Sequence, residues 1–346
     1  MKRVPRSAIV VLARNDRQAW WWPDVDWAAV DCEVDYWPVV VPRGRPRRLL
    51  SRAFGSMVWQ CVVRLFRARR QGHRYILTFE CDWPTFIIAG LQTLLFMRRP
   101  RHVVLQFIMR EKTDALASRV KYAFMRWCFS SVHRVVCSSR SECVYYDRVF
   151  GWSASRALFV PFHTDPAFLE HPQVETGSFV LSAGRTFRDY PALLDAFEGL
   201  DVPLLIVASP ASLEGRTPPP NVRVEFDVTH ADLASKMAES LLVVVPLTPR
   251  QISTGQSVVL EAMAMGKAVI ATRVAGTEDY LEHMKTGILV PPGDPEALRD
   301  AVTRLVADPG LRMRLGHAAR ARVLEGHLPR HYAVGVRQAL ETGSTP

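Results

Sequence analysis

One segment, residues 253–272, constrains the fold more than any other part of the chain. It reads STGQSVVLEAMAMGKAVIAT, which is a polar loop around Gly255, a short helix with one acid, Glu261, and an apolar strand. Burying a lone carboxylate is costly unless a polar partner faces it, and the N–H groups at the start of a helix favour an anion such as phosphate. The segment therefore predicts an α/β domain with a nucleotide site, in which Glu261 accepts hydrogen bonds from ribose hydroxyls.

The rest of the chain alternates between apolar strands and helices. In the C-terminal half we expect strands at 178–184, 203–209 and 221–226 and helices at 190–197, 311–324 and 330–340. In the N-terminal half we expect strands at 8–13, within 29–41, and at 74–79, 102–109, 133–138 and 156–161, with helices at 46–70, from 84, and near 115–130 and 142–149. Such alternation predicts parallel sheets covered on both faces, and 346 residues suffice for two domains.

Residues 253–272 resemble the donor-binding segment of retaining family-4 glycosyltransferases. That segment has a Glu, seven residues, a second Glu, then Ala-Met-Ala, Gly-Lys and an apolar strand ending in Ala-Thr. Glu261 matches the second Glu, which contacts the ribose, and Gly266 and Lys267 match the Gly-Lys pair. Ser253 stands where the family has its first Glu, which contacts the donor sugar. The resemblance implies ribose binding by Glu261 and places Ser253 and Thr254 at the donor sugar, where the chain departs from the family pattern.

The resemblance extends to the strand at 178–184 and the residues after it. The family has a Gly-Arg pair and then a Lys at this point, and both cations hold the donor diphosphate. Arg185 matches the Arg, and Arg188 is the cation nearest to the position of the Lys. Arginine offers a rigid bidentate fork to phosphate, so the exchange is chemically suitable. The resemblance implies diphosphate contacts from Arg185, Arg188, Gly255, Gln256 and Ser257, a catalytic role for Arg185, and base contacts from Phe226 and Val228.

The family implies a GT-B architecture, in which two Rossmann-like parallel-sheet domains face each other across a cleft. On this basis we expect an acceptor-binding domain at 1–165, a linker at 166–177 and a nucleotide-sugar-binding domain at 178–325. The final segment, 326–346, is expected to form a helix that crosses back to the N-terminal domain.

The net charge of +10 is unevenly distributed. Residues 1–160 contain 27 Lys and Arg and 12 Asp and Glu, a net charge of +15, whereas the remainder has 17 basic and 22 acidic residues, a net charge of −5. This asymmetry indicates nucleic acid or an anionic membrane surface. The chain has no recognised nucleic-acid-binding motif, so we favour the membrane and expect no nucleic acid. The arginine-rich helix at 46–70 could lie on anionic lipid, or pack its apolar stripe on its own sheet.

Cysteine usage and hydropathy bear on location. All six cysteines lie in the N-terminal half without a C-x-x-C pair, which predicts reduced thiols. The apolar run at the N-terminus is too short for a signal peptide, and the longest apolar run, 85–97, is too short to span a bilayer. We expect a cytoplasmic protein, with a peripheral position on the inner face of the plasma membrane as a further option.

The expected reaction is transfer of a sugar from a nucleotide-diphosphate sugar to a hydroxyl of a sugar or lipid-linked sugar acceptor, with retention. It would serve exopolysaccharide, lipopolysaccharide or glycolipid synthesis. Preorganised cations would stabilise the leaving diphosphate, and no metal or cofactor is expected because no Asp-x-Asp motif lies near the donor segment. Glu111 is a candidate general base, or a helix-start acid near a capping Thr113. Glu80, Asp82 and Arg110 also follow strands, where ligands of open α/β sheets gather.

Two other functions stay open on the sequence. The first is a degenerate glycosyltransferase-like scaffold or partner protein, because Ser253 replaces an acid and the family's His after the strand at 102–109 is missing. The second is a nucleotide-sugar epimerase of the same fold, which would need its own acid–base pair. A dinucleotide oxidoreductase is disfavoured, because no G-x-G-x-x-G follows the first strand.

Overall fold

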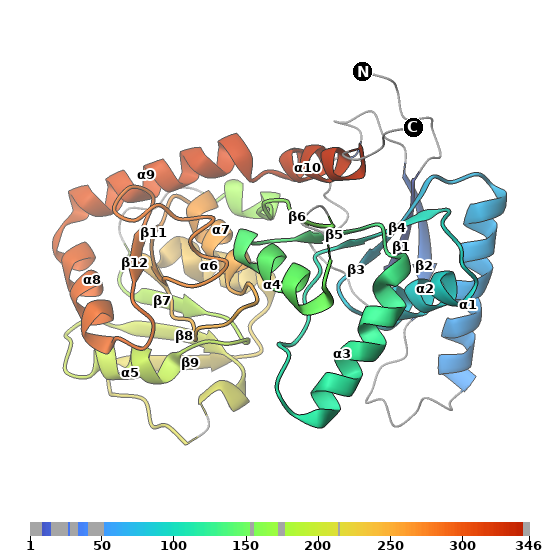
Figure 1. Ribbon diagram of the computed structural model, residues 1–346. Helices are drawn as coiled ribbons and strands as arrows, with labels where there is room; N and C mark the ends of the chain where they lie inside the picture. Colours follow the sequence, from blue (N-terminus) through green and yellow to red (C-terminus); the bar gives the residue numbers. More distant parts are fainter. Residues whose placement is uncertain are drawn as a thin grey trace. The chain divides into compact units, whose positions relative to one another are not determined.

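The computed structural model describes residues 9–14, 27, 34–40, 52–152, 156–171, 177–213 and 215–341 (Figure 1). The chain divides into two compact units. Unit 1 comprises Met1–Val160 and Ala333–Pro346, and unit 2 comprises Pro161–Tyr332. Within the described residues each unit is built on a six-stranded parallel sheet covered by helices, which confirms the predicted α/β fold class.

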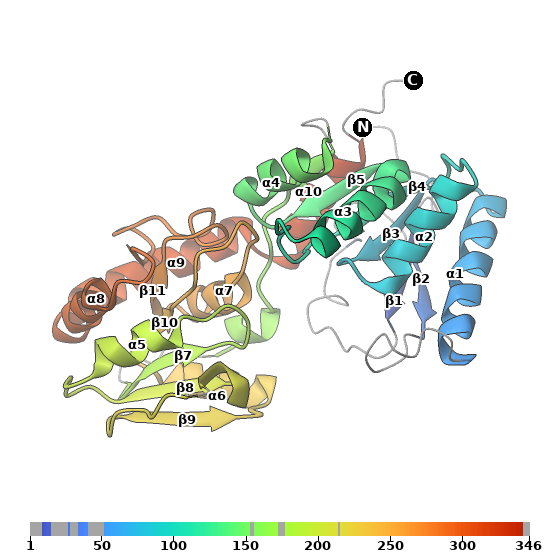
Figure 2. The same ribbon diagram turned by 60° about the horizontal axis from the view of Figure 1, so that its bottom comes forward.

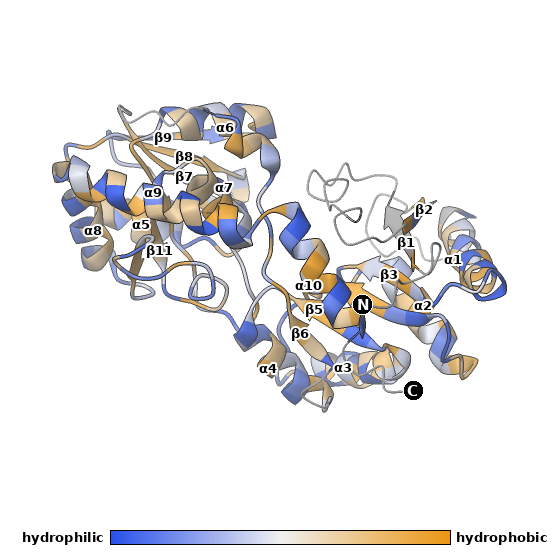
Figure 3. Cartoon of the chain, turned by 90° about the horizontal axis from the view of Figure 1, so that it is seen from above, coloured by the Kyte–Doolittle hydropathy of each residue, from blue (hydrophilic) through white to orange (hydrophobic). Residues whose placement is uncertain are grey.

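The sheet of unit 1 has the strand order β2-β1-β3-β4-β5-β6. Its strands are β1 (Ile9–Arg14), β2 (Val34–Val39), β3 (Tyr75–Phe79), β4 (Arg101–Leu105), β5 (Arg134–Cys137) and β6 (Ala157–Phe159). Apolar runs make up most of these strands, and β5 and β6 are mostly orange in Figure 3, as expected of strands covered on both faces. The buried His102 in β4 bonds the Thr78 hydroxyl at 2.8 Å, and burial lowers the pKa of this histidine to about 3.

The helices of unit 1 are α1 (Arg52–Arg70), α2 (Trp83–Leu94), α3 (Leu116–Cys128) and α4 (Arg140–Phe150), with a 3-10 turn, η3 (Phe129–Ser131), after α3. Local chemistry fixes their ends: the Asp82 carboxylate accepts from the Thr85 N–H at 3.1 Å and starts α2, and Gly151, with φ of 63°, ends α4. Figures 1 and 2 show α1, α2 and α3 side by side on unit 1.

The last helix, α10 (Pro329–Glu341), begins in unit 2 and continues into unit 1. In unit 1 the Tyr75 hydroxyl donates to the Leu340 carbonyl at 2.8 Å, so the end of α10 is tied to β3. A Cβ atom on Gly335 would lie 2.6 Å from a methyl group of Val160, which shows how closely α10 approaches the end of β6.

Unit 2 has the strand order β12-β11-β10-β7-β8-β9. The strands are β7 (Val180–Ala183), β8 (Leu204–Ala208), β9 (Val222–Phe226), β10 (Leu242–Val245), β11 (Ala268–Thr272) and β12 (Ile288–Val290). The helices are α5 (Tyr190–Phe197), α6 (His230–Glu239), α7 (Gln256–Ala264), α8 (Pro295–Ala307) and α9 (Pro309–Gly326), with 3-10 turns η4 (Pro166–Leu169) and η5 (Pro210–Leu213). Its core is formed mainly by aliphatic residues of the strands, α5, α8 and α9.

The strand order of unit 2 reverses between β7 and β10. From β7 the chain passes through α5 to β8 on one side, and from β10 it passes through α7 to β11 on the other. The two loops that leave the carboxyl ends of β7 and β10 therefore diverge at a topological switch point, where open parallel sheets bind their ligands.

Most predicted elements lie within a few residues of the observed ones, although α6, β10, α8 and β12 were not specified by the sequence analysis. Thr113 was a wrong prediction for a helix cap, since α3 begins at Leu116 with Ala115 in the cap position. The expected linker at 166–177 falls inside unit 2. Three parts of the predicted elements lie outside the described residues: 172–176 of the linker, 46–51 of the predicted helix at 46–70, and 342–346 of the final segment. No helix among the described residues combines the length and hydropathy that a bilayer-spanning segment needs.

Candidate functional site

The loop after β7 folds back on itself around one arginine. Gly184 has φ of 134°, a conformation that side-chain-bearing residues rarely adopt. Arg188 turns back over this glycine, with Nε donating to the Ala183 carbonyl and Nη1 to the Thr186 carbonyl, both at 3.0 Å. The Tyr190 hydroxyl donates to the Gly184 carbonyl at 2.7 Å. These bonds hold a half-buried cation at the carboxyl end of β7.

The same loop is joined to the segment that follows β10. Arg188 forms an isolated antiparallel bridge with Leu247, and the Thr248 N–H donates to the Phe187 carbonyl at 3.0 Å. The guanidinium of Arg250 lies 4.9 Å from the centre of the Phe187 ring, within cation–π range. The two loops at the switch point of unit 2 are thus joined by direct contacts, and together they carry Arg185, Arg188 and Arg250.

Helix α7 begins in this region. Gly255 occupies its N-cap position with φ of 86°, and a Cβ atom there would lie 2.9 Å from a methyl group of Leu247. Glycine is needed here for both reasons. The next residue, Gln256, is 7% exposed, and its buried Nε2 has no hydrogen-bond partner among the described residues. A buried amide donor at a helix start offers a directed contact to an oxygen of a ligand.

Glu261 lies on the buried side of α7 and is 2% exposed. The pKa of this carboxyl is raised to about 8, mainly by burial and also by the negative charge of Asp165, while the guanidinium of Arg188 opposes the rise. In turn, burial lowers the pKa of Arg188, while Tyr190 and Glu261 oppose that change. Glu261, Arg188 and Asp165 therefore form one electrostatic cluster, and strongly shifted carboxyl groups of this kind are common at functional sites.

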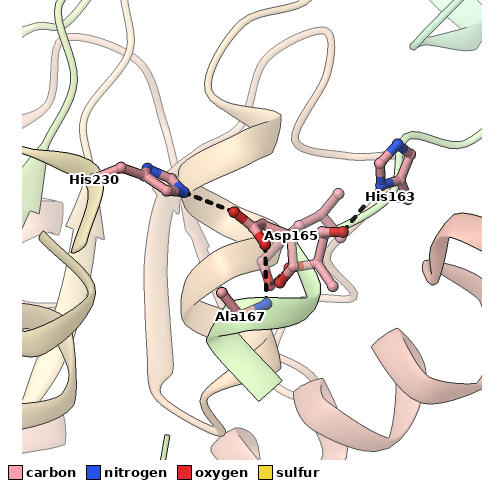
Figure 4. Close-up of polar contacts among 6 residues, drawn as sticks. His163, Asp165, Ala167 and His230 are labelled. Carbon is pink, nitrogen blue, oxygen red and sulfur yellow. Dashed lines mark hydrogen bonds and ion pairs between the residues drawn. The ribbon is translucent and has the colours of Figure 1, made fainter. Parts of the chain in front are cut away.

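Asp165 links this cluster to the start of α6 (Figure 4). One carboxylate oxygen accepts from the Ala167 N–H at 2.9 Å and caps η4, while the other pairs with His230 Nε2 at 3.0 Å. The rings of Phe168 and His230 are 5.0 Å apart. The segment that ends at His230 contains Phe226, which is exposed, and Val228, which is half-buried. The contact between His230 and Asp165 therefore holds the end of the predicted base-binding segment beside the residue whose charge raises the pKa of Glu261.

The structure places the remaining predicted residues of unit 2 around these loops. Arg185 is exposed on the loop after β7, and Ser253 is buried just before α7. Thr254 and Ser257 are half-buried on either side of the helix start. Lys267, which matches the Lys of the family's Gly-Lys pair, is 4% exposed and donates to the carbonyls of Ala238 and Ser240 at 2.6 and 2.7 Å.

The predicted residues of unit 1 follow two neighbouring strands. Glu80 and Asp82 follow β3, and Arg110 and Glu111 come after β4, which pairs with β3. Asp82 caps α2, and Arg110 is exposed, with its carbonyl accepting from the Tyr122 hydroxyl. Glu111 is half-buried. Within the described part of the chain no group of three or more His, Cys, Asp and Glu side chains is arranged to hold a metal ion.

Asp165, His230 and Arg250 were not predicted as site residues from the sequence. Asp165 and Glu261 are far apart in sequence, so helical or strand periodicity cannot relate them. The pairing of His230 with Asp165 depends on the tertiary fold in the same way. Arg250 had a local signal, because it lies in the polar stretch between β10 and α7, next to the segment that carries the resemblance.

The loops and α7 lie in a region that matches a known protein family. Residues 185–308 match the family described as "Glycosyl transferases group 1". Most of unit 2 is therefore similar to this glycosyltransferase family. The match spans the two loops, α7 and Glu261, and so confirms the predicted relation to glycosyltransferases, while assignment to retaining family 4 stays a prediction.

Two curated relatives of this chain are glycosyltransferases. The chain is 32% identical over 168 residues to D-rhamnosyltransferase WbpZ of Pseudomonas aeruginosa, covering 44% of this chain and 43% of that protein. It is 35% identical over 92 residues to alpha-D-kanosaminyltransferase of Streptomyces kanamyceticus, covering 27% of this chain and 23% of that protein. The matched region thus spans less than half the length of these relatives.

Solved structures resemble the chain over nearly its whole length. A glycosyltransferase from Rickettsia africae has a TM-score of 0.71 and 11% identity, covering 99% of this chain and 100% of that one. The Anabaena protein HepE, solved in complex with UDP, has a TM-score of 0.66 and 16% identity over 96% and 99% of the two chains. At such identities the likeness concerns the fold, and it confirms the predicted GT-B architecture of two Rossmann-like units.

Proposed function

We propose that the protein is a retaining glycosyltransferase that moves a sugar from a nucleotide-diphosphate sugar to an acceptor hydroxyl. One observation carries the proposal: Glu261 and Arg188 belong to one buried electrostatic cluster at the topological switch point of unit 2, in the region similar to group 1 glycosyltransferases. The buried acid, Glu261, suits the ribose of a nucleoside diphosphate. The folded-back arginine, Arg188, suits its diphosphate.

Each residue has a chemical task in this proposal. The carboxylate of Glu261 accepts from the ribose hydroxyls, and Arg185 and Arg188 neutralise the diphosphate as the bond to the sugar breaks. The start of α7, with Gly255, Gln256 and Ser257, offers N–H groups to the same phosphates. Phe226 and Val228 border the base. Ser253 and Thr254 lie at the donor sugar, and the buried Gln256 amide adds a neutral donor there in place of the missing acid.

UDP is the first nucleotide to consider, because a structure of similar fold, that of HepE, is a complex with UDP. The acceptor side is assigned to unit 1, where Glu111 is the proposed general base and Glu80, Asp82 and Arg110 border the acceptor. The acceptor is a sugar or a lipid-linked sugar of polysaccharide, lipopolysaccharide or glycolipid synthesis, which agrees with a peripheral position of a cytoplasmic enzyme on an anionic membrane. No metal or cofactor is assigned to the reaction.

A thermal-shift screen against UDP, GDP, ADP, dTDP and their sugar conjugates tests the donor assignment. We expect one nucleotide to raise the melting temperature of the wild-type protein, and one of its sugar conjugates to raise it further. The shift should disappear in Glu261→Ala. Absence of any shift in the wild-type protein contradicts the proposal and supports the scaffold function, which the replacement of the family's first acid by Ser253 favours.

A further inference from the structure

Helix α3 carries a row of large apolar side chains that the protein does not cover. Leu116 is 74% exposed, Val120 62%, Phe124 61% and Trp127 46%. With 100° of rotation per residue these four positions project within an arc of roughly 80°. The rings of Phe124 and Trp127 stack with their centres 5.9 Å apart. The opposite side of the helix is buried through Tyr122, Met125 and Cys128, so the exposed row is a second, separate apolar face.

The apolar row continues onto the end of α2. Leu94 is 61% exposed, Leu95 46% and Phe96 89%. The hydroxyl of the preceding residue, Thr93, donates to the Cys128 carbonyl at 2.8 Å, which places the end of α2 beside the end of α3. We refer to the four residues of α3 together with Leu94, Leu95 and Phe96 as the α2–α3 patch. Contiguous exposed apolar side chains of this kind mark interaction sites.

The sequence around the patch is mainly basic, although two acids, Glu111 and Asp114, lie just before the start of α3. Residues 83–110 and 115–141 contain no Asp or Glu, and α1 contains none either. Arg98 and Arg99 follow the end of α2, and Arg119, Lys121 and Arg126 lie on α3, all of them exposed. A helix that only faces water usually mixes both signs of charge. Exposed aromatic and aliphatic side chains flanked by Lys and Arg are instead the composition of helices that lie in a membrane interface.

We propose that the α2–α3 patch binds the surface of an anionic lipid bilayer. Phe96, Phe124 and Trp127 enter the boundary between headgroups and acyl chains, and the flanking arginines and Lys121 contact lipid phosphates. This inference specifies the membrane contact within the proposed function. It places that contact on α3 and the end of α2, and not on the arginine-rich helix α1, for which lipid binding was one of two options on the sequence. It does not depend on donor chemistry, which belongs to unit 2.

Vesicle sedimentation of the full-length protein tests the inference, with phosphatidylcholine vesicles containing or lacking phosphatidylglycerol. We expect binding only to the anionic vesicles, and an affinity that falls as salt screens the charges. The double variant Phe124→Ser/Trp127→Ser should lose at least about tenfold in vesicle affinity. The triple variant Arg119→Gln/Lys121→Gln/Arg126→Gln should lose affinity and most of the salt dependence. Equal binding of the wild-type protein to neutral vesicles would overturn the role of anionic lipid.

Helix α1 offers a matched control, because Trp59 is 67% exposed and Phe66 40%. We expect Trp59→Ser/Phe66→Ser to bind anionic vesicles within about twofold of the wild-type protein. Loss of binding in this variant, with full binding in Phe124→Ser/Trp127→Ser, assigns the contact to α1 and overturns the inference. If the α3 variant abolishes a wild-type dimer in sedimentation velocity and the wild-type protein does not bind vesicles, the patch is an interface between copies, which also overturns it.

Two readouts separate this inference from the donor assignment. Unchanged circular dichroism and an unchanged nucleotide-induced thermal shift establish that the α3 variant is folded and that unit 2 is intact. Glu261→Ala should bind vesicles like the wild-type protein. Vesicle binding without any nucleotide response contradicts the donor assignment alone, and a nucleotide response without vesicle binding contradicts the membrane inference alone.

Discussion

The guanidinium of Arg188 occupies the space that a side chain at Gly184 would need. There are two reasons why the residue after β7 has to be glycine. Its φ of 134° excludes most side chains, and the arginine that folds back to the Ala183 carbonyl leaves no room for a methyl group. Gly184 is therefore a means of positioning the half-buried cation of the candidate site.

Gly184→Ala should displace Arg188 and weaken nucleotide binding. The backbone strain and the clash together should lower the free energy of unfolding by about 1–3 kcal/mol. Denaturant unfolding and nucleotide calorimetry measure the two effects. Gly199→Ala is the matched control, because Gly199 also has a positive φ, 74°, but a Cβ there meets no atom within 4 Å. The control should lose stability and keep its nucleotide affinity; equal affinities in both variants would contradict the role of Arg188.

Glu261→Ala should weaken binding of the responding nucleotide by about 1–3 kcal/mol, the range for leaving buried hydrogen-bonding partners unsatisfied. Isothermal titration calorimetry with UDP and GDP measures the loss. Glu278→Ala is a suitable control, because its side chain is 56% exposed and pairs only loosely with Arg273, at 3.7 Å. Unchanged affinity in Glu261→Ala would show that another residue holds the ribose.

The ligand-free protein should lose stability as the pH rises towards 8. The pKa of Glu261 is raised by burial from 4.5 to about 8. The folded state therefore holds this proton more tightly than the unfolded state. The resulting stability is complete below pH 4.5 and is lost as the pH rises through about 8. Urea unfolding between pH 5 and 9 should show a smaller pH dependence for Glu261→Gln, which is neutral throughout. Parallel curves for the two proteins would contradict a buried, protonated Glu261.

Asp165→Asn should move the titration of Glu261 to lower pH. The charge of Asp165 raises the pKa of Glu261, and the variant removes that charge while an amide oxygen can still accept from the Ala167 N–H. Carboxyl titration by NMR of the ¹³C-labelled protein measures the shift directly. An unchanged pKa would show that burial and Arg188 determine the behaviour of Glu261 without Asp165.

Lys267→Met should affect stability and leave nucleotide binding unchanged. The variant removes two hydrogen bonds to buried carbonyls, with an expected cost of about 1–3 kcal/mol per unsatisfied group. Thermal unfolding and calorimetry distinguish the two properties. A loss of nucleotide affinity similar to that of Glu261→Ala would contradict a purely structural role for this lysine.

The fold was largely predictable because its signals are local. Apolar runs bounded by glycine and proline predicted the strands, and α5 was predicted at its observed bounds, where Asp189 caps the helix and Pro191 lies in its first turn. The helix expected near 115–130 corresponds to α3, but the capping signal at Thr113 was misleading, because the cap position belongs to Ala115.

The candidate site was predictable only in part. The residues of α7 were identifiable because loop, helix and acid lie within one short segment. Asp165 and His230 were not, because their contact and their influence on Glu261 arise from parts of the chain that meet only in the folded unit. The exposed face of α3 was equally hidden, since Leu116, Val120 and Phe124 have the same spacing as core residues of an amphipathic helix.

The hydrogen bond between Tyr75 and Leu340 has a consequence for synthesis on the ribosome. Unit 1 is built from residues on both sides of the whole of unit 2. A nascent chain can complete unit 2 while β3 still lacks the helix that will tie to it. Unit 1, which carries the α2–α3 patch, can complete its fold only after residue 340 has left the exit tunnel. Unit 2 can therefore finish folding first.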